Sequence, residues 1–337
     1  MNKIQTNSST VTSQEIHAMS QRLNNRVTQV VTEIAEDNIN RMNKYKEDKN
    51  QLNAGCFYPN EYFQALKEMG FQDRLEFFLK KGSFFHGYVS PKHFTMIKCT
   101  DSPSGFKCHC FFLKQGVTPS DGIDAIRKGI SLIGCGEICQ IACYEAIRSE
   151  LGDEKFNAMF ALNSKTPLVI SWAYANPLTC LLTQTKDPID CFEGEVLHFQ
   201  NSEHYQKKHT NGDAKGFNVI CCKSTIGEPV FTGLGVLNQT VNKMNEKMLN
   251  ALNEKPVGFS IMTEEMATRQ RKGICANNLQ ITEKLVDYQM DEDTFLGTGG
   301  GVITVKHTLN VDRISELAQL PIKDAVAKFT SWCWSGK

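Results

Sequence analysis

The chain has 337 residues, and its 37 basic and 37 acidic side chains leave a formal net charge of zero. This balance argues against the proteins that bind nucleic acid or anionic membranes through a broad basic surface, so recognition must depend on a local site. The length suffices for a substantial core in one large domain or two smaller ones.

The 13 cysteines are an odd number and include the adjacent pair Cys221 and Cys222, which is not the pattern of a disulfide framework. We interpret them as free thiols, which favours a reducing compartment such as the cytoplasm. The first residues contain no apolar signal core, and no run of about 18 apolar residues occurs. We therefore expect a soluble protein without a membrane span, while export by a dedicated injection machine, which needs no such signal, stays open.

The first predicted element is a long amphipathic helix. From Thr12 to about Lys49, apolar residues recur at intervals of three and four. Thr12 and Glu15 have the spacing of a capping box at its start. The apolar stripe predicts a helix that packs on the core, with an oligomer contact or a helical arm as alternatives.

Short elements and turns follow this helix. Residues 55–105 are expected to be loop-rich because glycine and proline interrupt their apolar runs. The aromatic segment 106–116 predicts a strand. The next segment predicts a short helix that is capped by Ser120 or Asp121 and ends near Gly129.

The second half of the chain predicts a sheet and a further helix. Residues 156–185 are expected to form an irregular connection. The three segments 194–201, 217–223 and 228–236 alternate like strands and are separated by turn residues, which indicates one antiparallel sheet. Helical periodicity follows over 237–254. The glycine-rich segment 296–305 enters a strand and not a helix, so we interpret it as a hairpin turn and not as a phosphate-binding loop.

Cys135 is the residue with the clearest chemical setting. The segment LIGCGEICQIACYEAIRSELG predicts a helix that ends at Gly152, with Cys135 on its opening turn. Unpaired N–H groups and the positive end of the helix dipole favour a thiolate there. The same N–H groups can stabilise the oxygen of a tetrahedral intermediate, so one turn offers both a nucleophile and an oxyanion site.

The neighbouring cysteines have a simpler interpretation. Cys139 and Cys143 follow Cys135 at helical spacing and can pack as small apolar residues. A zinc site that combines them with Cys108, His109 and Cys110 is the alternative, but no C-x-x-C pair occurs and adjacent strand residues point to opposite faces. We therefore expect no metal.

A series of segments surrounds Cys135 in a recognisable order: LKQGVTPSDGIDAIRKG, then the cysteine nine residues ahead of YEA, then PLTCLL, GEVLHFQNSEHY, KGFNVICC and EPVFTGLGV. Over roughly residues 106–236 the chain thereby resembles the bacterial spore-coat type of protein-glutamine gamma-glutamyltransferase, a thiol transglutaminase with a papain-like or NlpC-like fold. The resemblance implies that Cys135 attacks a glutamine carboxamide of a protein substrate and releases ammonia through a thioester. A lysine amine then accepts the acyl group, or water does so in deamidation.

No cofactor and no nucleic-acid partner is implied. A thiol peptidase or amidase would use the same residues.

The resemblance also implies two glutamates. One lies directly before the cysteine, and the other, which serves as the base, lies in a G-E-N strand motif. This chain has Gly134 and Phe217 at those positions. A phenylalanine cannot accept a proton, so either another residue serves as the base or the chain is an altered or inactive binding or inhibitory protein of the same fold.

Three further side chains are candidates for the catalytic site. His209 is the first choice for the base, because imidazole titrates near neutrality and Asp213 in the same loop can orient the ring. Asn218 offers an amide that can polarise the substrate carbonyl or hold the base. His198 lies in an alternating strand, where it either faces the site or is an ordinary sheet residue.

These observations predict an α+β fold in which the nucleophile lies at the start of a helix that packs on an antiparallel sheet. The expected organisation is an N-terminal helical arm over residues 1–50, a papain-like catalytic core over 51–255, and a C-terminal α/β extension over 256–337. That extension is either a separate unit or part of the same domain.

Overall fold

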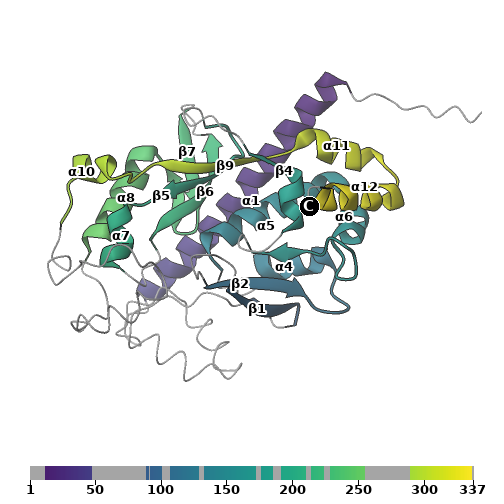
Figure 1. Cartoon of the computed structure of the whole chain (residues 1–337), viewed down its shortest axis with the longest axis horizontal. Helices are drawn as coiled ribbons and strands as arrows, with labels where there is room; N and C mark the ends of the chain where they lie inside the picture. The colour runs from purple at the N-terminus through teal and green to yellow at the C-terminus, as the bar shows by residue number, and fades with distance from the viewer. Residues whose placement is uncertain are drawn as a thin grey trace, which may run out of the picture.

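The computed structural model describes residues 12–47, 89–90, 92–100, 107–128, 133–171, 176–184, 191–209, 214–223, 228–254 and 289–335. These residues combine helices with antiparallel sheets (Figure 1), which confirms the predicted α+β class. Most of the expected loop-rich section 55–105, and Asp213, lie outside the described residues.

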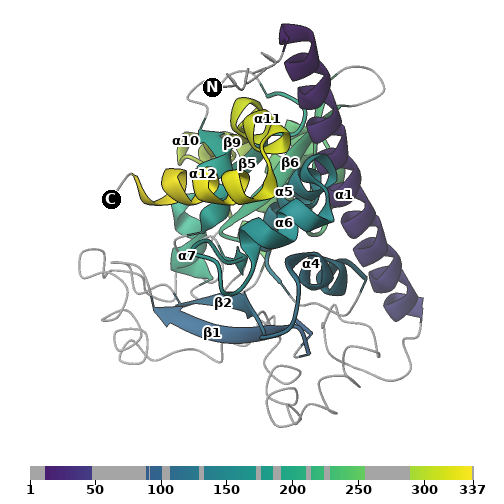
Figure 2. The same ribbon diagram turned by 90° about the vertical axis from the view of Figure 1, so that its right-hand side faces the viewer.

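Helix α1 (Ser13–Glu47) confirms the long amphipathic helix and runs along one side of the molecule (Figure 2). The capping box is present: the Thr12 N–H donates to Glu15 Oε2 at 2.8 Å, and the Glu15 N–H donates to Thr12 Oγ1 at 3.2 Å. The apolar stripe is buried against helix α5 (Cys135–Leu151) and the main sheet. Helix α1 is therefore part of the core and not a free arm.

The main sheet has the strand order β4-β9-β5-β6-β7-β8, and every neighbouring pair is antiparallel. The three central predicted strands are confirmed and pair in sequence order. The strands of this sheet are β4 (Leu182–Gln184), β5 (Val196–Gln200), β6 (Gly216–Lys223), β7 (Pro229–Gly233), β8 (Val236–Gln239) and β9 (Ile303–Leu309). A smaller antiparallel sheet contains β1 (Phe94–Thr100), β2 (Lys107–Leu113) and β3 (Val169–Ile170).

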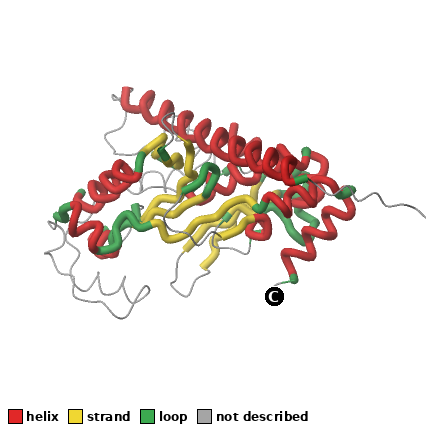
Figure 3. Tube along the Cα trace, turned by 90° about the horizontal axis from the view of Figure 1, so that it is seen from above, coloured by secondary structure: helices red, strands yellow, loops and turns green. Residues whose placement is uncertain are grey.

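Helices lie against the strands of the main sheet (Figure 3). The two faces of this sheet bury different sets of side chains. One face, with Val196 and Ile220, packs against α1 and α5; we call this the α5-side core. The other face, with Leu197 and Val219, packs against α8 (Val241–Asn253); we call this the α8-side core. Two short helices, α7 (Glu203–Lys208) and α10 (Glu292–Gly297), lie beside α8. Residues that alternate along one strand therefore enter different cores.

Several helices surround α5 and complete the α5-side core: α4 (Pro119–Lys128), α6 (Asp153–Phe160), the 3-10 helix η1 (Pro177–Leu181), α11 (Val311–Gln319) and α12 (Ile322–Trp334). Two predictions need correction here. Thr118 and not Ser120 or Asp121 caps α4, because its Oγ1 accepts the Asp121 N–H at 3.1 Å. The segment 156–185 also contains more regular structure than expected, because α6 buries Phe156, Met159 and Phe160.

Strand β9 belongs to the C-terminal segment but lies between β4 and β5 in the main sheet. The predicted strand after the glycine-rich turn is therefore confirmed, while the hairpin interpretation of that turn is wrong. The turn connects α10 to β9 and does not join two neighbouring strands. The segment 256–337 thus contributes a central strand to the sheet that carries the site.

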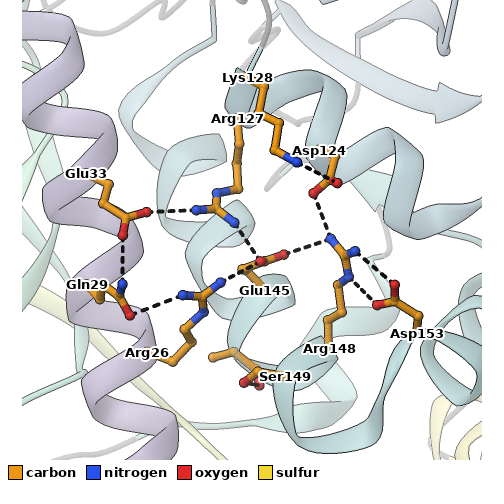
Figure 4. Close-up of polar contacts among 11 residues, drawn as sticks. Arg26, Gln29, Glu33, Asp124, Arg127, Lys128, Glu145, Arg148, Ser149 and Asp153 are labelled. Atoms are coloured by element: carbon orange, nitrogen blue, oxygen red, sulfur yellow. Dashed lines mark hydrogen bonds and ion pairs between the residues drawn. The ribbon is translucent and has the colours of Figure 1, made fainter.

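A buried carboxylate fixes α5 between α1 and α4 (Figure 4). Glu145 accepts from Arg26 at 2.8 Å, from Arg127 at 2.6 Å and from Arg148 at 3.3 Å. Two of these arginines, Arg127 and Arg148, also reach acidic residues of α1, α4 and α6. A buried charge is tolerated only with such partners, so this network specifies how α5 sits against its neighbours.

Within the described part of the chain, no helix combines the length and the apolar content needed to cross a membrane.

Candidate active site

Cys135 is the first residue of α5, as the sequence predicts. The preceding Gly134 is extended, with φ −76° and ψ 171°, and no side chain caps the helix. The helix is anchored because Ile138, Ile141 and Ala142 are buried in the α5-side core. Its first turn thus presents main-chain N–H groups beside the half-buried Cys135 side chain.

Asn218 on β6 contacts the Cys135 sulfur through two donors. Its main-chain N–H and its side-chain Nδ2 each lie 3.3 Å from Cys135 Sγ. The main-chain N–H of Gly136 also donates to this sulfur. Three N–H groups thus converge on one atom, which is the arrangement needed to stabilise a negative charge there.

His198 is the next residue in the same polar chain. It is paired with Asn218 across strands β5 and β6, and its Nδ1 lies 3.1 Å from Asn218 Oδ1. If Asn218 directs Nδ2 toward the sulfur, His198 must carry its proton on Nδ1, which leaves Nε2 as the basic nitrogen. Burial lowers the pKa of His198, and the bond to Asn218 opposes this shift, so the ring is neutral near pH 7.

The protonation state of Cys135 differs from the expected thiolate. Burial raises the pKa of the Cys135 thiol above its ordinary value, although the donors of Asn218 and Gly136 act in the opposite direction. The residue keeps part of its surface open, but the protein atoms around the sulfur remove more stabilisation by water than these bonds restore. Cys135 therefore rests as a thiol, and a base would be needed for it to act as a nucleophile.

The carboxylate of Glu137 folds back over the start of α5. A Cβ atom built on Gly134 would lie 2.6 Å from Glu137 Oε2, so the absence of a side chain at Gly134 leaves the space that this carboxylate occupies. Its negative charge adds to burial in raising the pKa of Cys135. Glu137 is thus a second group near the thiol that can accept a proton.

His209 lies elsewhere in the structure. Its ring stacks on Tyr205, with centroids 4.7 Å apart, and its Nε2 lies 3.0 Å from the Leu252 carbonyl oxygen. Burial lowers its pKa. These contacts place the ring between α7 and α8, while the contacts of Cys135 are with Asn218. Of the two candidate histidines, the structure brings His198 and not His209 to the polar chain that starts at Cys135.

Phe217 points away from the nucleophile. It packs against the α8-side core, whereas its neighbour Asn218 contacts Cys135 on the opposite face of the sheet. A side chain at position 217 therefore lies on the far side of the strand from the sulfur. The phenylalanine at this position does not remove a proton acceptor from the immediate surroundings of Cys135.

Strand β9 adds two residues that sequence reasoning missed. Val305 is paired with His198, and His307 is paired with Val196 in the same strand. Because partners in an antiparallel pair share a face, Val305 and His307 lie on the face that carries His198. Burial lowers the pKa of His307. Only the strand order could reveal them, since β9 is far from Cys135 in sequence.

The neighbouring thiols do not extend the site. Cys139 and Cys143 are buried in the α5-side core, as expected for small apolar residues, and burial raises the pKa of both. The side chains of residues 108 and 109 lie outside what the structure describes. Among the described residues, no group of three or more His, Cys, Asp or Glu side chains could hold a metal ion.

A sequence model of the family described as protein-glutamine gamma-glutamyltransferase matches residues 105–274, just over half of the chain. The chain belongs to this family. The match contains Cys135, His198 and Asn218 and ends before β9. Family membership confirms the resemblance of the segments around the cysteine and classes the protein as an acyltransferase that acts on protein glutamine.

Two further comparisons add less to this assignment. A solved structure, a transglutaminase from Geobacillus stearothermophilus without its C-terminal extension, is similar with a TM-score of 0.48 and 13% sequence identity, over 92% of this chain and 100% of that one. No curated protein sequence matches the chain significantly.

Proposed function

We propose that this glutamyltransferase modifies glutamine side chains of proteins through a thioester on Cys135, and that the acyl group passes to an amine or to water. The observation that carries the proposal is the contact of Cys135 Sγ with two donors of Asn218 at the uncapped start of α5. In the first step the sulfur bonds to the carboxamide carbon and its proton leaves to a base. Collapse of the tetrahedral intermediate expels ammonia and leaves the thioester.

The donors around the sulfur serve both stages of this reaction. While the sulfur carries charge, Asn218 and Gly136 stabilise it. Once the sulfur is bonded to carbon, that charge moves to the substrate oxygen, and N–H groups freed from the sulfur can stabilise the oxyanion. This exchange requires no movement of the helix.

His198 is our choice for the base that replaces His209. Its ring is neutral near pH 7, and Nε2 is the acceptor when Nδ1 donates to Asn218. The Asn218 amide lies between the thiol and Nδ1 of the ring, so transfer to Nε2 requires the substrate carboxamide to displace this amide from the sulfur and the imidazole to turn Nε2 toward the thiol. The protonated ring then supplies the proton that ammonia needs to leave.

Glu137 is the competing base, and a glutamine substitution at each position distinguishes the candidates. His198→Gln should lower kcat by about 100-fold or more, the usual contribution of a general base. Glu137→Gln should instead lower the pKa of Cys135 and leave kcat within about threefold, because with His198 as the base it removes a repulsive charge and not the proton acceptor of the reaction. The reverse pattern would assign the base to Glu137.

The main experiment incubates wild type and Cys135→Ala with a glutamine-bearing protein and a dansylated amine. Incorporation of the label with release of ammonia supports acyl transfer, and ammonia without label supports deamidation. Shortened substrate chains would indicate a thiol peptidase. If wild type and Cys135→Ala show equal label and equal ammonia, the proposal fails and an inactive binding protein is favoured.

A further inference from the structure

Two half-buried cysteines lie side by side away from the active site. Cys180 belongs to η1 and Cys333 to α12, which pack against each other at the edge of the α5-side core. The side chains of Cys333 and Cys180 are in hydrogen-bond contact. Cys333 Sγ also lies 3.9 Å from the Pro177 carbonyl oxygen.

Arg313 places a positive charge beside this pair. Its Nη1 donates to the Cys180 carbonyl oxygen at 2.5 Å, and its guanidinium stacks 5.1 Å from the centroid of the Trp332 ring. The hydrogen bond from Cys333 and the charge of Arg313 lower the pKa of Cys180 to about 7, although burial opposes the shift. Cys180 differs in this respect from Cys135, Cys139 and Cys143, whose pKa values are raised.

We propose that Cys180 and Cys333 form a reversible disulfide by exchange with a small-molecule disulfide such as glutathione disulfide. The Cys180 thiolate attacks one sulfur of the oxidant, which forms a protein–glutathione disulfide and expels one glutathione thiolate. Cys333 then loses its proton to solvent and attacks the Cys180 sulfur, which expels the second glutathione. Two protein thiols are oxidised, and one glutathione disulfide is reduced to two glutathione molecules.

The two cysteines have distinct roles in this exchange. Cys180 attacks first because it is the more acidic thiol. Cys333 cannot compete at that stage, since its hydrogen bond to Cys180, its burial and the nearby thiolate all raise its pKa. After the first step the Cys180 sulfur carries no charge, so the effects of Cys180 are removed and only burial still opposes ionisation of Cys333 as it resolves the mixed disulfide.

The Cys180–Cys333 disulfide would link helix α12 covalently to the main sheet. Cys180 lies just before β4, which pairs with β9, so a bond to Cys333 links α12 to the strand next to β9. Closure of so long a loop constrains the unfolded chain more than the folded one. The oxidised protein should therefore show a higher Tm than the reduced protein.

The test exposes the full-length protein to glutathione disulfide at about pH 7, followed by alkylation and peptide mapping by mass spectrometry. Cys180 should react roughly threefold faster than an ordinary thiol, because its larger thiolate fraction outweighs its weaker nucleophilicity. Wild type should give a peptide that joins Cys180 to Cys333. In Cys333→Ser, the mixed glutathione disulfide at Cys180 should persist.

Two controls keep the outcome decisive. Cys180→Ser should leave Cys333 as a thiol, and Cys191→Ser, at another half-buried cysteine, should form the linked peptide as wild type does. Unchanged circular dichroism confirms that each variant is folded. The proposal is overturned if wild type keeps both thiols reduced, or if it accumulates the Cys180 mixed disulfide as fully as Cys333→Ser does.

Discussion

Replacement of Asn218 by alanine removes the side-chain donor to the Cys135 sulfur and leaves the main-chain donor in place. A hydrogen bond to a charged group contributes about 1.5–3 kcal/mol. One pH unit of pKa corresponds to about 1.4 kcal/mol, so the pKa of Cys135 should rise by about one to two pH units. The pKa rises because the donor that is lost stabilises the thiolate and not the thiol.

A second substitution at the same position tests this reasoning further. Asn218→Asp keeps an acceptor for the His198 Nδ1 proton, but its carboxylate gives the sulfur no donor and adds a negative charge. The pKa of Cys135 should therefore increase in the order wild type, Asn218→Ala, Asn218→Asp. His198 should respond oppositely in the two variants, since its pKa falls without the Asn218 oxygen and rises beside a carboxylate.

The assay is the rate of alkylation of Cys135 by iodoacetamide as a function of pH, measured on its own peptide because the chain has 13 cysteines. The peptide of Cys191 serves as the internal reference in every variant. An unchanged or lower pKa of Cys135 in Asn218→Ala would refute the assigned contact, and so would an Asp variant that does not exceed the Ala variant.

Two further substitutions test the elements that hold the site. Glu145→Ala should lower the free energy of unfolding by about 3 kcal/mol, because three arginines lose a buried partner. Glu150→Ala, which frees only a largely exposed arginine, should cost less than about 1 kcal/mol in the same urea titration, and equal losses would contradict the network. Gly216→Ala should reduce activity by about 100-fold, because its Cβ would clash with the Phe199 carbonyl oxygen and lie 2.7 Å from the His198 ring, which displaces both the strand and the ring. Gly297→Ala, whose Cβ meets nothing within 4 Å, should retain activity, and a Gly216→Ala enzyme as active as Gly297→Ala would exclude this position for the ring.

Features that depend on local sequence could be predicted. The capping box of α1, the helix that starts at Cys135, and the strands β5 to β7 follow from periodicity and turn residues over short windows. The cap of α4 shows the limit of such reasoning. Three polar residues stand in the segment Thr118 to Asp121, and only the reciprocal bond between Thr118 and Asp121 decides which one lies outside the helix.

Features that depend on strand pairing could not be predicted. The insertion of β9 between β4 and β5 brings Val305 and His307 to the site face from a distant part of the chain. The choice between His198 and His209 has the same origin. Both rings suit a base chemically, and only the pairing of β5 with β6 places one of them beside Asn218.

The register of β6 determines which face of the sheet carries Phe217, the residue that stands in place of the motif glutamate. Asn218 contacts the nucleophile on one face, so Phe217 enters the α8-side core on the other. A shift of one residue would exchange the two faces and place the phenylalanine against Cys135. In the observed register, position 217 faces away from Cys135. A glutamate there would place a charge in the apolar α8-side core, and its carboxylate would not reach the thiol proton. A proton acceptor for Cys135 is therefore expected among the side chains that share a face with Asn218 or lie at the start of α5. Of the described residues, His198, His307 and Glu137 meet this condition, and His198 and Glu137 have contacts with Asn218 and with the start of α5, respectively.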